Sequence, residues 1–178
     1  MLKKVLLAFV LAVAVLAAIV ALQPGEYHVE RSAAIAAPPA AVFPLIGDFH
    51  QWDAWSPWAK LDPAMKLEIA GQPCSAGTTY TWSGNDKAGA GKMTMTECRP
   101  NEKVGVDLAF TKPYTSDATL DFTLKPQAEG TAVTWAMTGR SNFMLKAVGL
   151  FASMDKMVGP DFEKGLAQLK SAAEGMKR

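Results

Sequence analysis

The sequence has few of the residues from which metal centres and nucleophilic sites are commonly built. It contains two cysteines, Cys74 and Cys98, and two histidines, His28 and His50, in 178 residues. Neither cysteine belongs to a CxxC pair, and no ligand spacing joins the histidines to them, so the sequence predicts no zinc site. Paired carboxylates, a nucleophile elbow and a phosphate-binding glycine loop are also missing from the sequence. We therefore expect no metal and no cofactor, and no catalytic residue stands out.

The chain also lacks a strong net charge and internal repeats. Its 18 lysines and arginines nearly balance its 17 acidic residues, and the formal net charge is +1. Such a chain has no strong field to attract a polyanion, so nucleic-acid binding is not expected.

One long hydrophobic run is present, at the N-terminus. Lys3 and Lys4 are followed by an unbroken apolar segment from Val5 to Leu22. As a helix this segment is roughly 27 Å long, enough to cross a slightly thin bilayer. The lysines precede the segment, and the next cation, Arg31, lies well beyond its end. The positive-inside rule therefore predicts that the following domain lies outside the cytoplasm, in the periplasm or the extracellular space.

A cleaved signal peptide is the alternative interpretation of this segment. Signal peptides usually have a shorter apolar core and a small-x-small cleavage site. Ala21 is a candidate last residue of such a peptide, but Ile19, two positions earlier, is bulkier than the rule prefers. We favour a retained anchor with a short linker over residues 1–25, followed by one ligand-binding domain over residues 26–178.

Export of the domain would permit a disulfide between its two cysteines. Cys74 precedes one predicted strand and Cys98 ends the next, so an antiparallel hairpin would bring them together. Two separate buried thiols that serve as small packing groups are the alternative.

Side-chain periodicity predicts a strand, two short helices, six more strands and a terminal helix. The first strand covers residues 28–37, a helix opens at Pro38-Pro39, and a second short helix holds Trp52 and Trp55. After Asn142, apolar spacings of three and four predict a long helix that is kinked or split near Pro160. The six further strands alternate with a period of two and are expected at residues 65–69, 78–83, 91–98, 104–110, 118–124 and 133–137.

Particular residues in this arrangement resemble a known superfamily. Val42-Phe43 and the segment from Asp48 to Trp58 are similar to the region after the first strand in START-like proteins of the polyketide cyclase/dehydrase and lipid-transport type, the SRPBCC superfamily. Residues 142–144, 153–157 and 161–166 resemble the end of its bacterial members. The resemblance covers about residues 26–170.

This resemblance implies an α+β helix-grip fold. In it, a curved antiparallel sheet of about seven strands wraps around a long C-terminal helix, and a cavity between sheet and helix suits an apolar small molecule. The superfamily hosts carriers, sensors, cyclases and hydrolases, so the resemblance specifies the fold and no single reaction.

The inward strand faces are rich in aromatic residues and methionine, which suits an adaptable apolar pocket. For any one of these residues an ordinary packed core is the simpler interpretation, and the hypothesis depends on their number. The candidate ligand-binding residues are Tyr80, Trp82, Met93, Met95, Phe110, Phe122, Trp135, Met137, Phe162, Leu166 and Leu169.

Four residues are candidates for the rim of the cavity: Trp52, Trp55, Tyr114 and Phe151. The spacing of Trp52 and Trp55 places them on one helical face, and a packing cluster that pins the short helices to the sheet is the favoured alternative for them. The segment 143–158 is apolar on more than one side, and we interpret it as a lid that also touches the membrane.

These observations favour a membrane-anchored, exported domain that binds an apolar or amphipathic small molecule or a lipid. The second hypothesis is a cyclase/dehydratase-type enzyme for a hydrophobic substrate, with His50 or Tyr114 moving protons. The third is a protein-interaction module that uses residues 52–58 or the terminal-helix face.

Overall fold

The computed structural model describes residues 1–175, and the last residues of the predicted domain, 176–178, lie outside the described part. The helices are α1 (Leu2–Ala21), α2 (Pro39–Gly47), the 3-10 helix η1 (Phe49–Ala54), α3 (Phe143–Gly149) and α4 (Met154–Gly175). The strands are β1 (Glu26–Ile35), β2 (Lys66–Ala70), β3 (Thr79–Ser83), β4 (Ala90–Arg99), β5 (Lys103–Lys112), β6 (Ser116–Gln127) and β7 (Gly130–Arg140).

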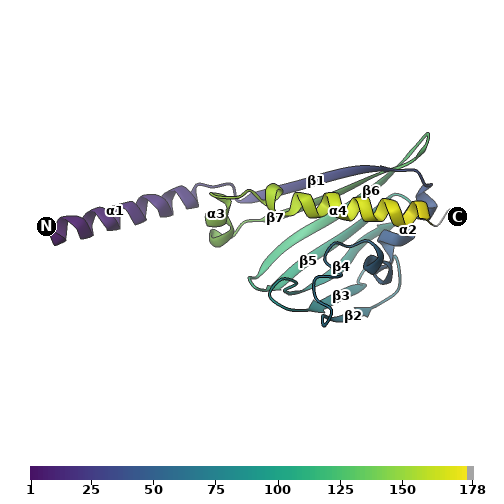
Figure 1. Ribbon diagram of the computed structural model, residues 1–178, viewed down its shortest axis with the longest axis horizontal. Helices are drawn as coiled ribbons and strands as arrows, with labels where there is room; N and C mark the ends of the chain where they lie inside the picture. The colour runs from purple at the N-terminus through teal and green to yellow at the C-terminus, as the bar shows by residue number, and fades with distance from the viewer. Residues whose placement is uncertain (176–178) are drawn as a thin grey trace.

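Helix α1 extends away from the rest of the molecule (Figure 1). Its side chains are exposed except for Val20, which lies close to α3 at the end of the helix. In the described part of the chain, α1 is the one helix that is long and apolar enough to cross a membrane. Its length and composition fit either a membrane anchor or a signal sequence.

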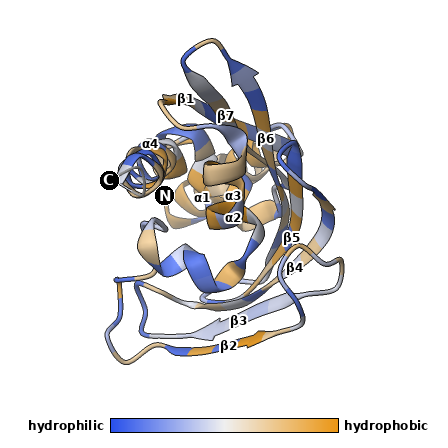
Figure 2. Cartoon of the chain, turned by 90° about the vertical axis from the view of Figure 1, so that its right-hand side faces the viewer, coloured by the Kyte–Doolittle hydropathy of each residue, from blue (hydrophilic) through white to orange (hydrophobic). Residues whose placement is uncertain are grey.

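The seven strands form one antiparallel sheet in the order β1-β7-β6-β5-β4-β3-β2. Figure 2 shows the sheet as an arc whose inner face is turned toward α2 and α4, which is the predicted helix-grip arrangement. β1 begins at Glu26 rather than at His28, because Glu26 and Tyr27 pair with Arg140 and Gly139 of β7. That pairing joins segments far apart in the sequence, so local alternation did not reveal it.

The strands separate an apolar inner face from a polar outer face, as their period of two requires. In β7 the inner residues Trp135 and Met137 are buried. On the outer face, the Thr134 hydroxyl lies 2.8 Å from the Ser32 hydroxyl.

Trp52 and Trp55 donate hydrogen bonds to carbonyl groups at the C-terminus of α2. The last carbonyl groups of a helix have no partner within the helix. The Trp55 indole N–H donates to the Leu45 carbonyl at 2.7 Å, and the Trp52 indole N–H donates to the Ile46 carbonyl at 2.9 Å. Both indoles are buried. The two tryptophans therefore pin η1 to α2 from within the core.

A disulfide joins Cys74, in the loop before β3, to Cys98 near the end of β4. The Cys74 backbone N–H also donates to the Gly47 carbonyl at 2.8 Å, so the same loop satisfies another terminal carbonyl of α2. The bridge therefore ties the β2–β3 loop, β4 and α2 together.

One arginine joins the first half of α4 to β1. Arg31 Nη1 lies 2.7 Å from Asp155 Oδ1, and Arg31 Nε lies 2.8 Å from Glu163 Oε1. The Arg31 guanidinium lowers the pKa of Asp155, chiefly by its hydrogen bond. Gly159 lies between these acidic residues, where a Cβ atom would meet Arg31 Nη2.

Of the two predicted outcomes at Pro160, a kink or a split, the split is wrong. Pro160 lies inside α4, and the neighbouring Gly159 provides space for Arg31 rather than ending the helix. The break occurs earlier, between Gly149 and Met154, where the Ser153 hydroxyl accepts a hydrogen bond from the Lys156 N–H at 3.3 Å.

Removal of the disulfide tests its part in stability. We expect the Cys74→Ala/Cys98→Ala variant to lose about 3 kcal/mol of unfolding free energy, because a bridge across a loop of this size restricts the unfolded chain. Denaturant unfolding of the full chain in detergent micelles measures this loss. The wild-type protein with its disulfide reduced is the control, and it should unfold at the midpoint of the variant. An unchanged midpoint in both would show that the bridge contributes no stability.

A pair of Trp→Phe substitutions tests the capping role of the indoles. Trp55→Phe and Trp135→Phe remove similar volume from the core, but only Trp55 donates a hydrogen bond through its indole. We expect Trp55→Phe to cost about 1 kcal/mol more than Trp135→Phe, since it leaves the buried Leu45 carbonyl without this donor. Equal losses in denaturant unfolding would contradict the capping role.

Candidate functional site

The deep half of the sheet–helix interface is filled with aromatic rings. Trp135 and Phe162 stack with ring centroids 4.0 Å apart and planes 10° apart. Phe122 also stacks on Trp135, with ring centroids 5.0 Å apart. Trp55 meets Trp135 edge to face at 5.5 Å. At these distances the rings are in van der Waals contact, which leaves no space for a ligand between them.

This packing changes the interpretation of several predicted ligand-binding residues. Phe122, Trp135, Phe162, Leu166 and Leu169 are buried against one another around the stack. Trp52 and Trp55 also lie in the core, where the packing alternative placed them, and not at a rim. The expected cavity therefore does not extend along the whole of α4.

Burial decreases across the inner face toward α3. A deep row runs across three strands in register and comprises Val104, Phe122 and Trp135, all 0% exposed. A middle row is also buried and comprises Met95, Val106, Leu120, Met137 and Val29. The next two rows, which we call the open rows, are less completely covered. They comprise Tyr80, Met93, Leu108, Ala118, Gly139 and Tyr27, and then Trp82, Gly91, Phe110 and Ser116.

Exposure in the open rows is partial and apolar. Leu108 and Met93 are each 8% exposed, and Phe110, Ala118 and Tyr27 are half-buried. Met154 and Val158, in the first turns of α4, are half-buried against the same core. The open rows of the sheet and the start of α4 therefore form the loosest part of the interface.

Two aromatic rings flank the open rows by lying over glycines. A Cβ atom on Gly139 would collide with the Tyr27 phenol, and a Cβ atom on Gly91 would collide with the Trp82 ring. Each ring thus occupies the space that a side chain on the neighbouring strand would take.

Four predicted ligand-binding residues fall in these rows: Tyr80, Trp82, Met93 and Phe110. Tyr27, Leu108 and Ala118 were missed, because the first strand was expected to begin after Tyr27 and because Leu108 and Ala118 are ordinary core residues by type.

The ionisable side chains of the open rows are the two tyrosines. Burial raises the pKa of Tyr27. Burial, and secondarily the charge of Asp53, raises the pKa of Tyr80. Both phenols therefore stay neutral near pH 7 and are able to donate a hydrogen bond.

The Trp135 indole N–H is a buried donor without a hydrogen-bond acceptor among the described residues. Trp55 and Trp58 both meet this ring edge to face, with interplanar angles of 81° and 90°. Ring faces are weak acceptors and partly compensate such a donor.

The other predicted polar candidates lie away from the inner face. His50 Nδ1 lies 2.8 Å from Asp48 Oδ1 at the start of η1, where His50 is exposed. Tyr114 is exposed in the β5–β6 loop, and Phe151 is exposed after α3. Among the described residues, no group of three or more histidine, cysteine, aspartate or glutamate side chains is arranged to hold a metal ion.

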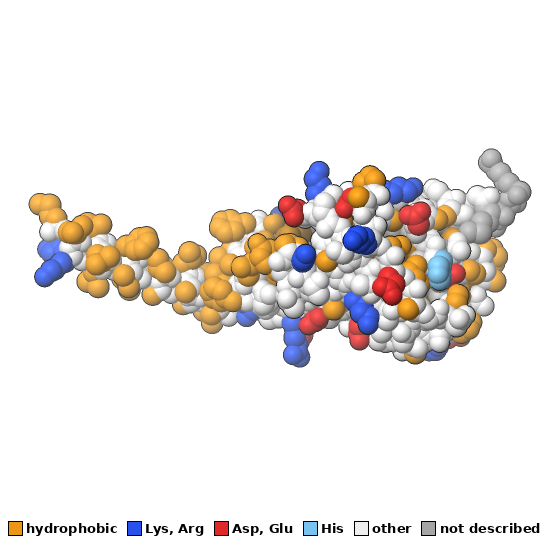
Figure 3. Space-filling model, turned by 90° about the horizontal axis from the view of Figure 1, so that it is seen from below, with side chains coloured by type: hydrophobic (Ala, Val, Ile, Leu, Met, Phe, Trp, Pro, Cys, Tyr) orange, Lys and Arg blue, Asp and Glu red, His pale blue; other side chains and the backbone are white. Residues whose placement is uncertain are grey.

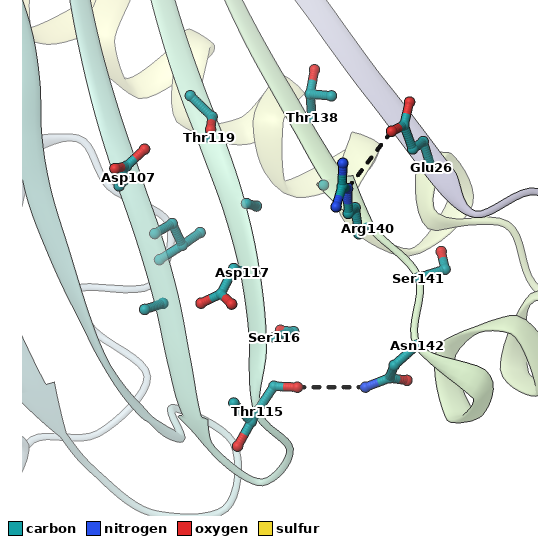
Figure 4. Close-up of a pocket in the computed structure, with 14 residues that line it drawn as sticks. Glu26, Asp107, Thr115, Ser116, Asp117, Thr119, Thr138, Arg140, Ser141 and Asn142 are labelled. Carbon is teal, nitrogen blue, oxygen red and sulfur yellow. Dashed lines mark hydrogen bonds and ion pairs between the residues drawn. The ribbon is translucent and has the colours of Figure 1, made fainter.

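A hollow of about 780 Å³ lies near the ends of β5, β6 and β7, and its lining joins polar residues of the outer face to Leu108, Ala118 and Gly139 of the open rows. Figure 4 shows Asp107, Thr119 and Thr138 on neighbouring strands, with Arg140 directed toward Glu26. The Arg140 Nε to Glu26 Oε1 distance is 3.7 Å, and both side chains are highly exposed. The hydroxyl and carboxylate groups of the outer face are well hydrated and suit water, whereas Leu108 and Ala118 add apolar atoms to the same lining.

A smaller hollow of about 340 Å³ lies beside η1 and β2. It is lined by Asp53, Lys60 and Asp62 together with Met65, Leu67 and Tyr80, so it reaches one end of the open rows. Neither hollow includes residues of the deep row.

Solved structures with this architecture come from several kinds of protein. The di-domain ARO/CYC protein StfQ from the steffimycin biosynthetic pathway matches with a TM-score of 0.66 and 12% identity over 86% of this chain and 52% of StfQ. A protein from Chromobacterium violaceum matches with a TM-score of 0.61 and 15% identity over 83% of this chain and 96% of its own. The Aha1 dimer from Colwellia psychrerythraea matches with a TM-score of 0.56 and 20% identity over 83% and 96%.

These identities show a shared fold alone. No curated protein matches the sequence. A family model described as polyketide cyclase / dehydrase and lipid transport matches residues 26–174, which is most of the chain and the whole sheet with α4. This family is associated with binding or cyclising hydrophobic small molecules. The chain belongs to the polyketide cyclase / dehydrase and lipid transport family.

Proposed function

We propose that this protein is a membrane-anchored, exported carrier or sensor domain that binds an apolar or amphipathic small molecule, such as a lipid, over the open rows. The observation that carries the proposal is the decrease in burial toward α3, where half-buried apolar side chains meet the start of α4. The tail of the ligand would cover Leu108, Phe110 and Ala118, and the first turns of α4 would close over it. The family description, which includes lipid transport, supports this choice of ligand.

Three features support anchoring and export. Helix α1 is long enough to span a bilayer and is exposed along nearly its whole length. Lys3 and Lys4 lie in its first turn, before the apolar run, which favours a cytoplasmic N-terminus. The Cys74–Cys98 disulfide is the kind of bond that persists in an oxidising compartment.

Binding is favoured over catalysis by the chemistry of the open rows. A cyclase or dehydratase needs a positioned acid or base. The ionisable groups in these rows are the phenols of Tyr27 and Tyr80, whose raised pKa values make them poor bases at neutral pH. As neutral donors they suit the recognition of a hydroxyl or carbonyl oxygen on a ligand headgroup.

The magnitude of apolar burial favours a long-chain ligand. Burial of about fifteen methylene groups contributes about 12 kcal/mol. Association costs of at least about 4 kcal/mol leave at most about 8 kcal/mol, which corresponds to a dissociation constant no tighter than about 1 µM. A shorter chain would bind too weakly to be retained.

Two neighbouring substitutions on opposite faces of β6 test the location. Ala118 is half-buried on the inner face and Thr119 is exposed on the outer face. Ala118→Trp should fill the open rows and lower the retention of added palmitate by about tenfold, equivalent to about 1.4 kcal/mol. Thr119→Trp should leave retention unchanged. Native mass spectrometry of the full chain released from detergent micelles measures the adduct fraction.

Retained thermal stability of Ala118→Trp is the folding control for this test. The same adduct fraction in both variants and the wild type would contradict binding over the open rows. Organic extraction of the wild-type protein and mass analysis of the extract then identify the natural ligand.

A further inference from the structure

Helix α3 and the residues after it expose an unusual amount of apolar surface. No residue of α3 is buried. Phe151 is 90% exposed, Phe143 is 59% exposed and Met144 is 49% exposed. Val148, Met157 and, from the β5–β6 loop, Tyr114 are exposed as well. Large apolar side chains gathered in this way mark a surface that a partner covers.

The same segment lies against the end of α1. Lys146 Nζ, in α3, lies 3.2 Å from the Ala21 carbonyl of the last turn of α1, and Val20 is buried close by. The Ser141 N–H donates to the Gly25 carbonyl at 2.9 Å, so the linker is fixed to the end of β7 as well. Figure 3 shows hydrophobic side chains continuing from α1 onto the adjacent end of the domain.

This placement determines what covers the surface. When α1 crosses a bilayer, its last turn lies at the edge of the hydrocarbon layer. Residues in contact with that turn then lie at the level of the lipid headgroups. Tyr114 is of the residue type enriched at this level, and Phe143 and Phe151 are of a type that interfacial helices bury at the boundary of headgroups and acyl chains. The one charged residue of α3, Lys146, has a long apolar stem and is able to extend its ammonium group toward water or lipid phosphate.

We propose that α3 and the following residues to Phe151 insert into the interface of the same bilayer that α1 spans, as a second membrane contact. The inference rests on the anchor of the proposed function and deepens it. Two contacts hold the domain in one orientation, with its α3 end toward the lipid. The open rows lie at this end of the sheet, so an apolar ligand would pass between them and the bilayer without crossing water.

Site-directed spin labelling of the full chain tests the second contact. The native cysteines are joined in a disulfide, so each introduced cysteine is the free thiol of its variant. Nitroxides at Phe151→Cys and Met144→Cys report on the inference, Ala14→Cys reports on α1, and Ser171→Cys on the exposed face of α4 is the aqueous control. The protein is reconstituted into vesicles of phosphatidylethanolamine and phosphatidylglycerol. Power saturation then compares accessibility to oxygen, which enters lipid, with accessibility to a charged nickel chelate, which does not.

We expect the label at 14 to show high oxygen and low nickel accessibility and the label at 171 to show the reverse, with the labels at 151 and 144 between them, at higher oxygen and lower nickel accessibility than the label at 171. If the labels at 151 and 144 resemble the label at 171 while that at 14 is in lipid, the second contact is overturned and the anchor stands. Protection of 151 and 144 from both reagents would mean that protein covers this surface, which also overturns the proposal. A label at 14 that is accessible to nickel would instead overturn the anchor itself.

Discussion

The face-to-face contact between Trp135 and Phe162 is the interaction on which the rest of the structure depends. It joins the middle of β7 to α4 at van der Waals distance, and Phe122, Trp55 and Trp58 pack around the pair. Gly165 allows this close approach, since a Cβ atom there would meet the Trp135 ring. With α4 fixed at this point, the half of the interface near the C-terminus is solid and the half near α3 stays loosely covered.

Hydrogen bonding reinforces the same division. The terminal carbonyls of α2 are satisfied by Trp55, Trp52 and the Cys74 N–H. These bonds join η1, its C-cap residue Trp55 and the β2–β3 loop to the end of α2. The loops around the deep row are thereby held in place, and the disulfide adds a covalent link. The start of α4, by contrast, is attached to the sheet chiefly through the solvent-accessible ion pairs of Arg31.

The architecture could be predicted from the sequence because its signals are local. Strand alternation, the proline pair before α2 and the helical periodicity after Asn142 indicated the order of elements. The position of the break before Met154 could not be recognised, because Gly159-Pro160 has the residue types of a helix end. In the structure Gly159 instead makes room for Arg31, which lies on a strand distant in the sequence. The true start of β1 depends on pairing with β7 and was missed for the same reason.

The candidate site could be predicted only in outline. Inward-facing aromatic residues follow from a period of two, but burial depends on which element covers each row. Trp82 and Phe110 lie in the open rows, whereas Trp135 and Phe122 have the same pattern and lie in the solid core. Residue type alone does not separate these two groups. Distance from the Trp135–Phe162 contact does.

Photo-crosslinking with a diazirine-bearing fatty acid tests the central claim most directly. With the full chain in lipid nanodiscs, fragmentation of the labelled peptides in the mass spectrometer locates the adducts to single residues. Binding over the open rows predicts adducts on the side chains of Leu108, Phe110, Ala118 and Met154, beyond those on α1. Adducts confined to α1, or found on the outer face around Thr119 and Thr138, would contradict it.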